Sequence, residues 1–177
     1  NLTGVVCSES LSSIPDSAFS YCQQLAAISL PGRLQYIGWR AFESCTNLTA
    51  VMIPSDVTYI SDYAFLSCSS LTEIQIPKKV YYLGGNYGGA FSECAKLKNL
   101  TVDADNPNFS SLDGVLLDKA QTALLQYPGG RTGSYSVPNS VTCIGNSAFR
   151  CCAGLTSITI SSGCTNIGSS AFAFCAS

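Results

Sequence analysis

A repeat of 23 residues runs through almost the whole of this 177-residue chain. Its clearest element is Ala-Phe-x-x-Cys-x-x-Leu followed by alternating apolar residues. The element begins at Ala18, Ala41, Ala64, Ala90 and Ala148, and its first half begins again at Ala171. Three of the five intervals are 23 residues long, and the others are 26 and 58. Recurrence at a fixed period of about 20–50 residues is typical of solenoids, propellers and linear arrays, so the fold belongs to one of these.

Each repeat starts with a strand pattern. In residues 71–76, apolar Ile74 and Ile76 alternate with polar Glu73 and Gln75, which is the period of a half-buried strand. A proline then ends the pattern, because proline cannot donate the next ladder hydrogen bond. A second extended piece of the form Val-x-x-Ile follows, so each repeat is predicted to have two extended sides.

The corner between repeats is predicted to be one helical turn that carries Ala-Phe-x-x-Cys. A polar residue two positions before the alanine is predicted to cap it; these are Asp16, Asp62, Asn146 and Ser169. So short a helix is unstable alone, and burial of its phenylalanine between coils must hold it. The phenylalanines expected to form one internal stack are Phe19, Phe42, Phe65, Phe91, Phe149 and Phe172.

These elements predict a β-rich α/β repeat solenoid, a right-handed coil with parallel strands and about seven or eight turns. We expect a single domain over residues 1–177, with regular repeats at 1–102 and 132–177. Neither end carries the polar cap that a free-standing solenoid needs. The chain is therefore expected to be a fragment of a longer one, in which the solenoid continues at one or both ends.

Two places depart from the period. Three extra residues at 84–89 predict a surface loop. Residues 103–131 form an irregular insertion in which apolar runs at 113–118 and 123–128 flank a short polar turn. Such an arrangement is typical of a β-hairpin.

Ten cysteines occur, and six of them share one phase of the repeat: Cys22, Cys45, Cys68, Cys94, Cys152 and Cys175. They indicate either a disulfide or metal framework, or a column of small buried side chains. Parallel side chains on stacked coils leave the Cβ atoms farther apart than the ~3.8 Å that a disulfide prefers, which favours buried thiols. The chain has neither a Cys-x-x-Cys pair nor a histidine, which argues against zinc.

Little in the sequence indicates chemistry. Without histidine, Ser-His-Asp and Cys-His sites are excluded, and the acidic residues are scattered, so neither an enzyme nor a cofactor is predicted. Residues 103–108 are either a calcium loop or a solvated turn, and the missing glycine and distal glutamate favour the turn. A net charge of −2 argues against nucleic acid. No apolar run reaches the ~18 residues of a membrane span.

Two surfaces are candidates for contact with a protein or glycan partner. One is the outward row of the first extended side, which includes Glu73, Gln75, Asn99 and Thr101 and is polar and almost uncharged. The other is an aromatic column made by Tyr36, Tyr59 and Tyr82, with Trp39 and Tyr63 nearby. The column either packs over the second extended side or offers exposed rings to a partner.

The repeats resemble the BspA-type class of leucine-rich repeats, also called the Treponema pallidum class. Residues 141–152, Val-Thr-Cys-Ile-Gly-Asn-Ser-Ala-Phe-Arg-Cys-Cys, are similar to its consensus, and residues 111–130 resemble a unit that recurs in the family. The resemblance implies a leucine-rich-repeat solenoid. Many members are cell-surface or secreted proteins that bind host proteins, matrix or other cells. It therefore implies a non-catalytic protein-binding or adhesion module, and the alternative is a structural scaffold or spacer within a larger assembly.

Overall fold

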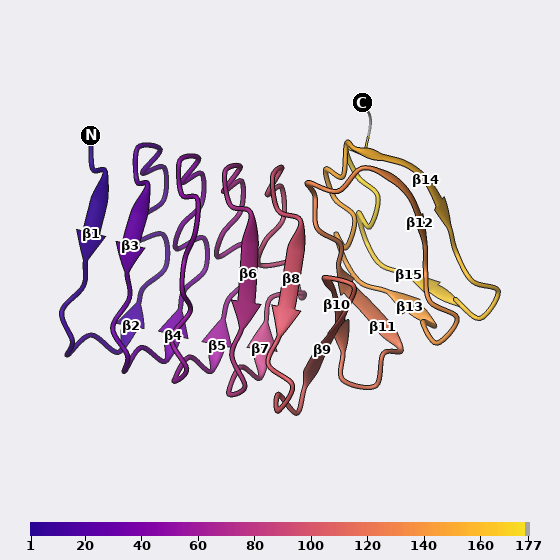
Figure 1. Cartoon of the computed structure of the whole chain (residues 1–177), viewed down its shortest axis with the longest axis horizontal. Helices are drawn as coiled ribbons and strands as arrows, with labels where there is room; N and C mark the ends of the chain where they lie inside the picture. The colour runs from indigo at the N-terminus through magenta and orange to yellow at the C-terminus, as the bar shows by residue number, and fades with distance from the viewer. Residues whose placement is uncertain (176–177) are drawn as a thin grey trace.

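The computed structural model describes residues 1–175. The chain winds into coils stacked along one axis, with the N-terminus at one end and the last coils at the other (Figure 1). The strands of the first side are β1 (Gly4–Val6), β3 (Ala27–Ser29), β6 (Glu73–Ile76), β8 (Asn99–Val102), β12 (Gly133–Ser136) and β14 (Leu155–Thr159). Those of the second side are β2 (Ser13–Ile14), β4 (Tyr36–Ile37), β5 (Tyr59–Ile60), β7 (Tyr82–Leu83), β11 (Ala123–Gln126), β13 (Cys143–Ile144) and β15 (Asn166–Ile167).

Strands of neighbouring coils pair in parallel, and equivalent repeat positions lie opposite one another. Tyr36 pairs with Tyr59 on the second side, and Glu73 pairs with Asn99 on the first. The third coil is irregular: in residues 50–53 the side chains of Val51 and Ile53 are buried, but no strand forms there. The sequence therefore predicts the alternation of burial at this coil correctly but not the hydrogen-bonded ladder.

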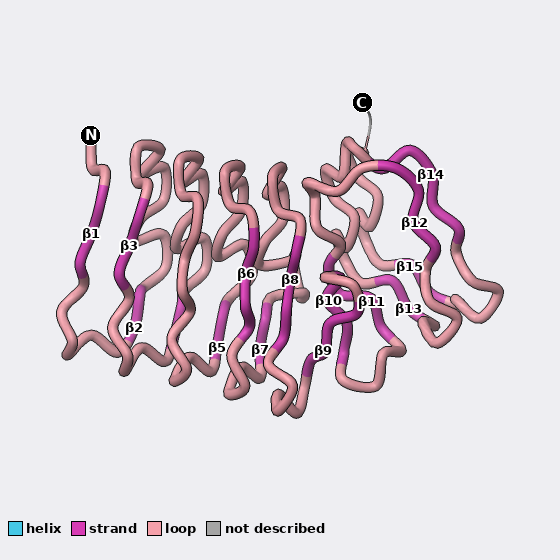
Figure 2. Tube along the Cα trace, viewed as in Figure 1, coloured by secondary structure: helices cyan, strands magenta, loops and turns pink. Residues whose placement is uncertain are grey.

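The predicted helical turn is wrong. Residues 1–175 contain no helix, and Figure 2 shows the corners as turns. The Phe19 N–H donates to the Ala41 carbonyl of the next coil at 2.8 Å, whereas the Ser20 N–H donates within its own coil to Ser17 at 3.1 Å. A helix would direct all these N–H groups along itself. Here alternate groups tie one coil to the next, and Ser17, at the start of the corner, has a φ of 56°, which is outside the helical range.

The predicted capping residues also act between coils. Asp16 Oδ1 accepts a hydrogen bond from the Trp39 N–H of the next coil at 2.8 Å, and Asn146 Oδ1 accepts one from the Ser169 N–H at 2.8 Å. Asp62 Oδ1 accepts three, from backbone N–H groups in the 84–89 loop. These side chains therefore replace inter-coil ladder bonds and do not cap a helix of their own coil.

The phenylalanine rings stack in two runs instead of one. Phe19, Phe42, Phe65 and Phe91 follow one another with ring centroids 5.3, 5.0 and 5.4 Å apart. Beyond the insertion, Phe149 and Phe172 continue at 5.0 Å. Tyr127 lies 5.0 Å from Phe149 on its other side, so a tyrosine occupies the phenylalanine place in the coil that contains β11.

The part of the insertion before residue 123 separates two arrays of coils, the first array at residues 1–102 and the second at 123–175, because residues 123–126 already pair with the second array. β9 (Phe109–Leu112) pairs antiparallel with β10 (Val115–Asp118), which pairs antiparallel with β11. Leu116 packs into the core of the first array, and Val115 and Leu117 pack into that of the second. β10 thus lies between two cores, and its three consecutive apolar residues, 115–117, are typical of a strand that is buried on both faces.

Candidate functional site

The first extended side, which we call the strand face, carries a groove. It has a volume of about 680 Å³ and is bordered by residues 50–55, 73–75, Pro77, Asn99, Thr101 and Asp103. The predicted row of Glu73, Gln75, Asn99 and Thr101 projects outward into it, because these residues alternate with buried ones on β6 and β8. The structure therefore brings these four predicted contact residues together.

The groove is polar at one side and apolar at the other. Met52 is 86% exposed and lies beside the irregular third coil. Glu73 and Asp103 supply two carboxylates, and no lysine or arginine of residues 1–175 borders the groove. Glu73 and Gln75 are both exposed on β6, so their polar ends are accessible to a partner. The groove can therefore accept a partner that offers hydrogen-bond donors and a short apolar side chain.

The aromatic column is largely committed to packing. The Tyr59 ring stacks on Tyr36 at 5.3 Å and on Tyr82 at 4.3 Å. The hydroxyls of the two outer rings donate to carboxylates, Tyr36 to Asp16 at 3.3 Å and Tyr82 to Asp62 at 2.7 Å. These contacts favour the interpretation that the column covers the second extended side, and they leave less of each ring for a partner.

Asp62 is held as a carboxylate by this network. Burial by itself would raise the pKa of Asp62. The hydrogen bonds from the Tyr82 hydroxyl and from the N–H groups of Tyr87, Gly85 and Gly88 outweigh burial, so the pKa is lowered. Burial and the same hydrogen bond raise the pKa of Tyr82. The pair thus fixes the 84–89 loop against the preceding coil.

The remaining aromatic candidates lie at the corner. Trp39 is 40% exposed, and the Arg40 guanidinium lies over its ring, 4.5 Å from the centroid. Arg40 also approaches the Tyr63 ring at 5.6 Å, and the Tyr63 hydroxyl donates to the Tyr87 carbonyl at 2.7 Å. Of the predicted aromatic contacts, Trp39 therefore offers the clearest exposed face.

Replacing Tyr59 by alanine is expected to lower the free energy of unfolding by about 1–3 kcal/mol, since each stacked aromatic pair contributes about 0.5–1.5 kcal/mol. Urea denaturation measures this. The matched control is Tyr87→Ala, because the Tyr87 side chain is exposed and is expected to lose under about 1 kcal/mol. Equal stability of wild type and Tyr59→Ala would show that the column is not a packing element.

The cysteine column consists of thiols that bind the neighbouring coil. All ten cysteines lie in the described part of the chain, and none is in a disulfide. The Cys45 Sγ–H donates to the Phe19 carbonyl at 3.1 Å, and the Cys68 Sγ–H donates to the Phe42 carbonyl at the same distance. Cys94 and Cys175 repeat this contact, while Cys22 in the first coil is half-buried and Cys152 is buried.

These thiols are unsuited to reaction. Burial raises the pKa of Cys45 and of Cys94 to about 12, so both remain protonated at neutral pH and keep the S–H donor that the carbonyl needs. In residues 1–175 no three His, Cys, Asp or Glu side chains are grouped so as to hold a metal ion.

The 103–108 segment is an exposed turn, as predicted, except for one buried side chain that the sequence does not indicate. Asn106 is fully buried, and its Nδ2 donates to the carbonyls of Pro77 at 2.9 Å and Val80 at 3.1 Å. Its Oδ1 accepts from the N–H groups of Asn108 and Phe109 at 2.8 and 2.9 Å. The Asn106 hydrogen bonds therefore attach the insertion to the preceding coil.

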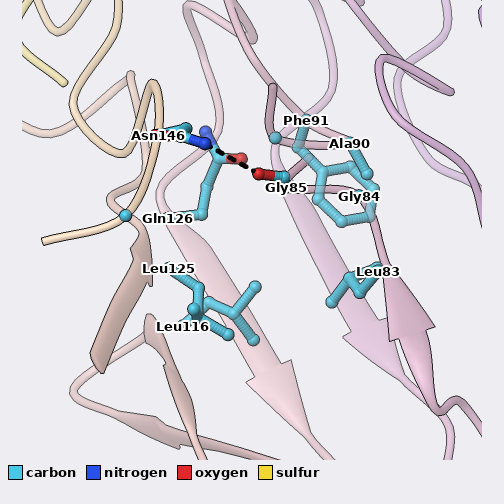
Figure 3. Close-up of a pocket in the computed structure, with 11 residues that line it drawn as sticks. Leu83, Gly84, Gly85, Ala90, Phe91, Leu116, Leu125, Gln126 and Asn146 are labelled. Atoms are coloured by element: carbon cyan, nitrogen blue, oxygen red, sulfur yellow. Dashed lines mark hydrogen bonds between the residues drawn. The ribbon is translucent and has the colours of Figure 1, made fainter. Parts of the chain in front are cut away.

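A small cavity lies between the two arrays near the second side (Figure 3). Its volume of about 60 Å³ is on the scale of a few water molecules, too small for a ligand. The Asn146 Nδ2 donates across it to the Gly85 carbonyl at 3.1 Å, and the buried Gln126 side chain packs over Gly89. The cavity therefore belongs to the junction between the arrays and is not a candidate ligand site.

Four residues that sequence reasoning missed line a further cleft at this junction: Lys98, Tyr127, Arg131 and Tyr135. The Ala-Phe pattern identifies none of them, because Tyr127 lacks the preceding alanine, and Lys98 precedes the insertion while Arg131 is its last residue. The sequence does carry a signal for Tyr127: it is an aromatic residue that follows a short apolar run, at the place where the other coils have their phenylalanine.

The chain belongs to the BspA-type leucine-rich repeat family. The family pattern described as the BspA type leucine rich repeat region matches in six copies at residues 1–112 and 131–177. Comparison with curated protein sequences gives no match. The described residues contain no helix that is long and apolar enough to cross a membrane.

Several solved structures of bacterial proteins share the fold. A leucine-rich repeat protein from Eubacterium ventriosum is 26% identical, with a TM-score of 0.80 over 97% of this chain and 51% of that one. The pneumococcal vaccine antigen PcpA is 25% identical, with a TM-score of 0.78 over 98% and 48%. A leucine-rich cell surface protein from Faecalibacterium prausnitzii is 27% identical, with a TM-score of 0.60 over 97% and 58%. The chain thus spans about half the length of the proteins that it resembles.

Proposed function

We propose that this chain is a non-catalytic protein-binding module of a cell-surface or secreted protein, and that its strand-face groove holds the partner in adhesion or recognition. The observation that carries this proposal is the groove of about 680 Å³, into which Glu73, Gln75, Asn99 and Thr101 project from adjacent parallel strands. A rigid ladder fixes these side chains, so little conformational entropy is lost when a partner binds. The similar proteins include one named as a surface protein and one named as a vaccine antigen, which supports the location.

A protein partner fits the groove better than a small substrate. The groove is open along several coils, combines polar ends with exposed Met52, and lies on strands that present hydrogen-bonding side chains at the spacing of the coils. Of the two surfaces that the sequence indicates, the aromatic column is occupied by its own stacking, so the groove is the stronger candidate. A spacer role requires no such surface.

The test is binding to a panel of purified extracellular-matrix and cell-surface proteins, measured by biolayer interferometry. We expect saturable binding to at least one protein, and Gln75→Arg should weaken it about tenfold, because a long charged side chain fills the groove. Gln23→Arg makes the same change at an exposed corner away from the groove and should leave the affinity unchanged. No binding would favour the spacer role, and binding that both substitutions affect equally would exclude the groove as the binding site.

A further inference from the structure

A second opening interrupts the strand face where the insertion separates β8 from β12. β8 pairs with β6 and β12 pairs with β14, and within residues 1–175 no ladder joins β8 to β12. The opening, which we call the seam cleft, has a volume of about 580 Å³ and is bordered by Lys98, Asn99, Tyr127, Gly130, Arg131, Thr132, Ser134 and Tyr135. The fold therefore creates a cleft here that the regular coils do not have.

Unpaired positive charges gather at the seam cleft. Lys98 and Arg131 border it. Neither forms an ion pair within residues 1–175, whereas Arg40, Lys79 and Arg150 each do. In a chain with a net charge of −2, this concentration of free cations favours an anionic ligand.

Tyr127 supplies a second, independent observation. Its ring takes the phenylalanine place in the stack and is only 3% exposed, yet it borders the seam cleft. The Arg131 guanidinium lies over this ring, 5.9 Å from its centroid. Burial raises the pKa of the Tyr127 hydroxyl, and the Arg131 charge opposes that rise. A phenylalanine would serve the stack equally well, so the hydroxyl is not needed for packing and lies beside Arg131 at the cleft.

The edge of β12 indicates that the ligand is a peptide. β12 pairs with β14 on one side only, so the backbone groups on its other edge face the seam cleft without a partner strand in the described chain. Such an edge can pair with an extended peptide backbone. Ser134 and Thr132 are exposed beside it and can bond the same segment.

We infer that the seam cleft binds an extended acidic segment of the protein partner, with a carboxylate of that segment between Lys98, Arg131 and the Tyr127 hydroxyl. Charged and phenolic donors together match the lone pairs of a carboxylate. The inference rests on the proposed function, because Asn99 borders both the groove and the seam cleft. Beyond the proposed function, the inference specifies that the partner carries a negative charge and that this charge binds at the seam cleft.

The experiment uses a fluorescently labelled hexaglutamate peptide as the probe and measures anisotropy at about 50 mM and 500 mM salt. Wild type should bind it saturably and lose most of this affinity at high salt. Lys98→Ala with Arg131→Ala should weaken binding about tenfold or more, and Tyr127→Phe, which keeps the stack, about three- to fivefold. The matched control, Arg33→Ala with Lys78→Ala, removes two charges in turns away from the cleft and should change affinity less than about twofold.

Three results would overturn the inference: no binding by wild type, equal losses in the two double variants, or a preference for an oligouronate over hexaglutamate. The first of these does not disturb the proposed function when a protein of the panel still binds and Gln75→Arg still weakens that binding. If hexaglutamate binds as expected but no panel protein does, the seam cleft stands and the groove proposal fails.

Discussion

Replacing Phe65 by alanine is expected to lower the free energy of unfolding by about 3–5 kcal/mol. The Phe65 ring is fully buried and lies between Phe42 at 5.0 Å and Phe91 at 5.4 Å. The coils on either side are tied by inter-coil hydrogen bonds, such as the one from the Phe65 N–H to the Ala90 carbonyl at 2.8 Å. They cannot collapse into the space, so the cost includes a cavity as well as lost apolar burial.

Urea denaturation followed by circular dichroism measures this loss. Phe174→Ala is the matched control, because it removes the same side chain at a site that is 68% exposed and should cost under about 1 kcal/mol. A loss at Phe65 no larger than that at Phe174 would mean that the stacked rings do not hold the coils together.

Sequence reasoning succeeds where burial follows the repeat. Ile74 is buried and Glu73 is exposed because alternation on a strand is a local property, and parallel stacking repeats it in every coil. The ladder expected at residues 50–53 is absent, because hydrogen bonding between strands is not a local property. Whether alternating residues also exchange hydrogen bonds depends on the exact placement of the neighbouring coils, which the pattern of apolar residues does not encode.

The conformation of the corner between repeats likewise could not be predicted from the sequence. A polar residue two positions before Ala-Phe-x-x-Cys suits a helix cap as well as a bond to the next coil. Asp62 makes the second kind of contact, with three N–H groups of the 84–89 loop. A positive φ recurs at corner residues such as Ser44, where it is 57°. None of these residues is a glycine, so the sequence does not indicate this backbone conformation.

The seam cleft could not be predicted because its parts are brought together only by the insertion. Lys98 precedes β8 and Arg131 precedes β12, and the distance between them depends on how β9 and β10 fold back. Tyr127 lacks the preceding alanine that identifies the phenylalanine column in the other coils. The site thus depends on a departure from the repeat, which the repeat itself cannot predict.

The Asn106→Asp substitution is expected to destabilise the protein by about 3 kcal/mol or more at neutral pH. The Asn106 Nδ2 donates to the carbonyls of Pro77 and Val80, and the new carboxylate would face both oxygens with no proton to offer. An unpaired charge in a fully buried site costs several kcal/mol, and the two carbonyls lose their donor as well. The insertion would then lose its attachment to the coil that contains Pro77 and Val80.

This loss should shrink as the pH falls. Burial opposes ionisation of the new carboxyl, so its pKa in the folded protein lies above that in the unfolded chain. The folded state then binds the proton more tightly, and stability relative to wild type rises from about pH 7 to about pH 4, where the protonated group can again donate one hydrogen bond. Asn139→Asp, at an exposed turn, should stay within about 0.5 kcal/mol of wild type at every pH. Urea denaturation across this range measures both variants, and a loss at position 106 that does not change with pH would exclude burial of the charge as its cause.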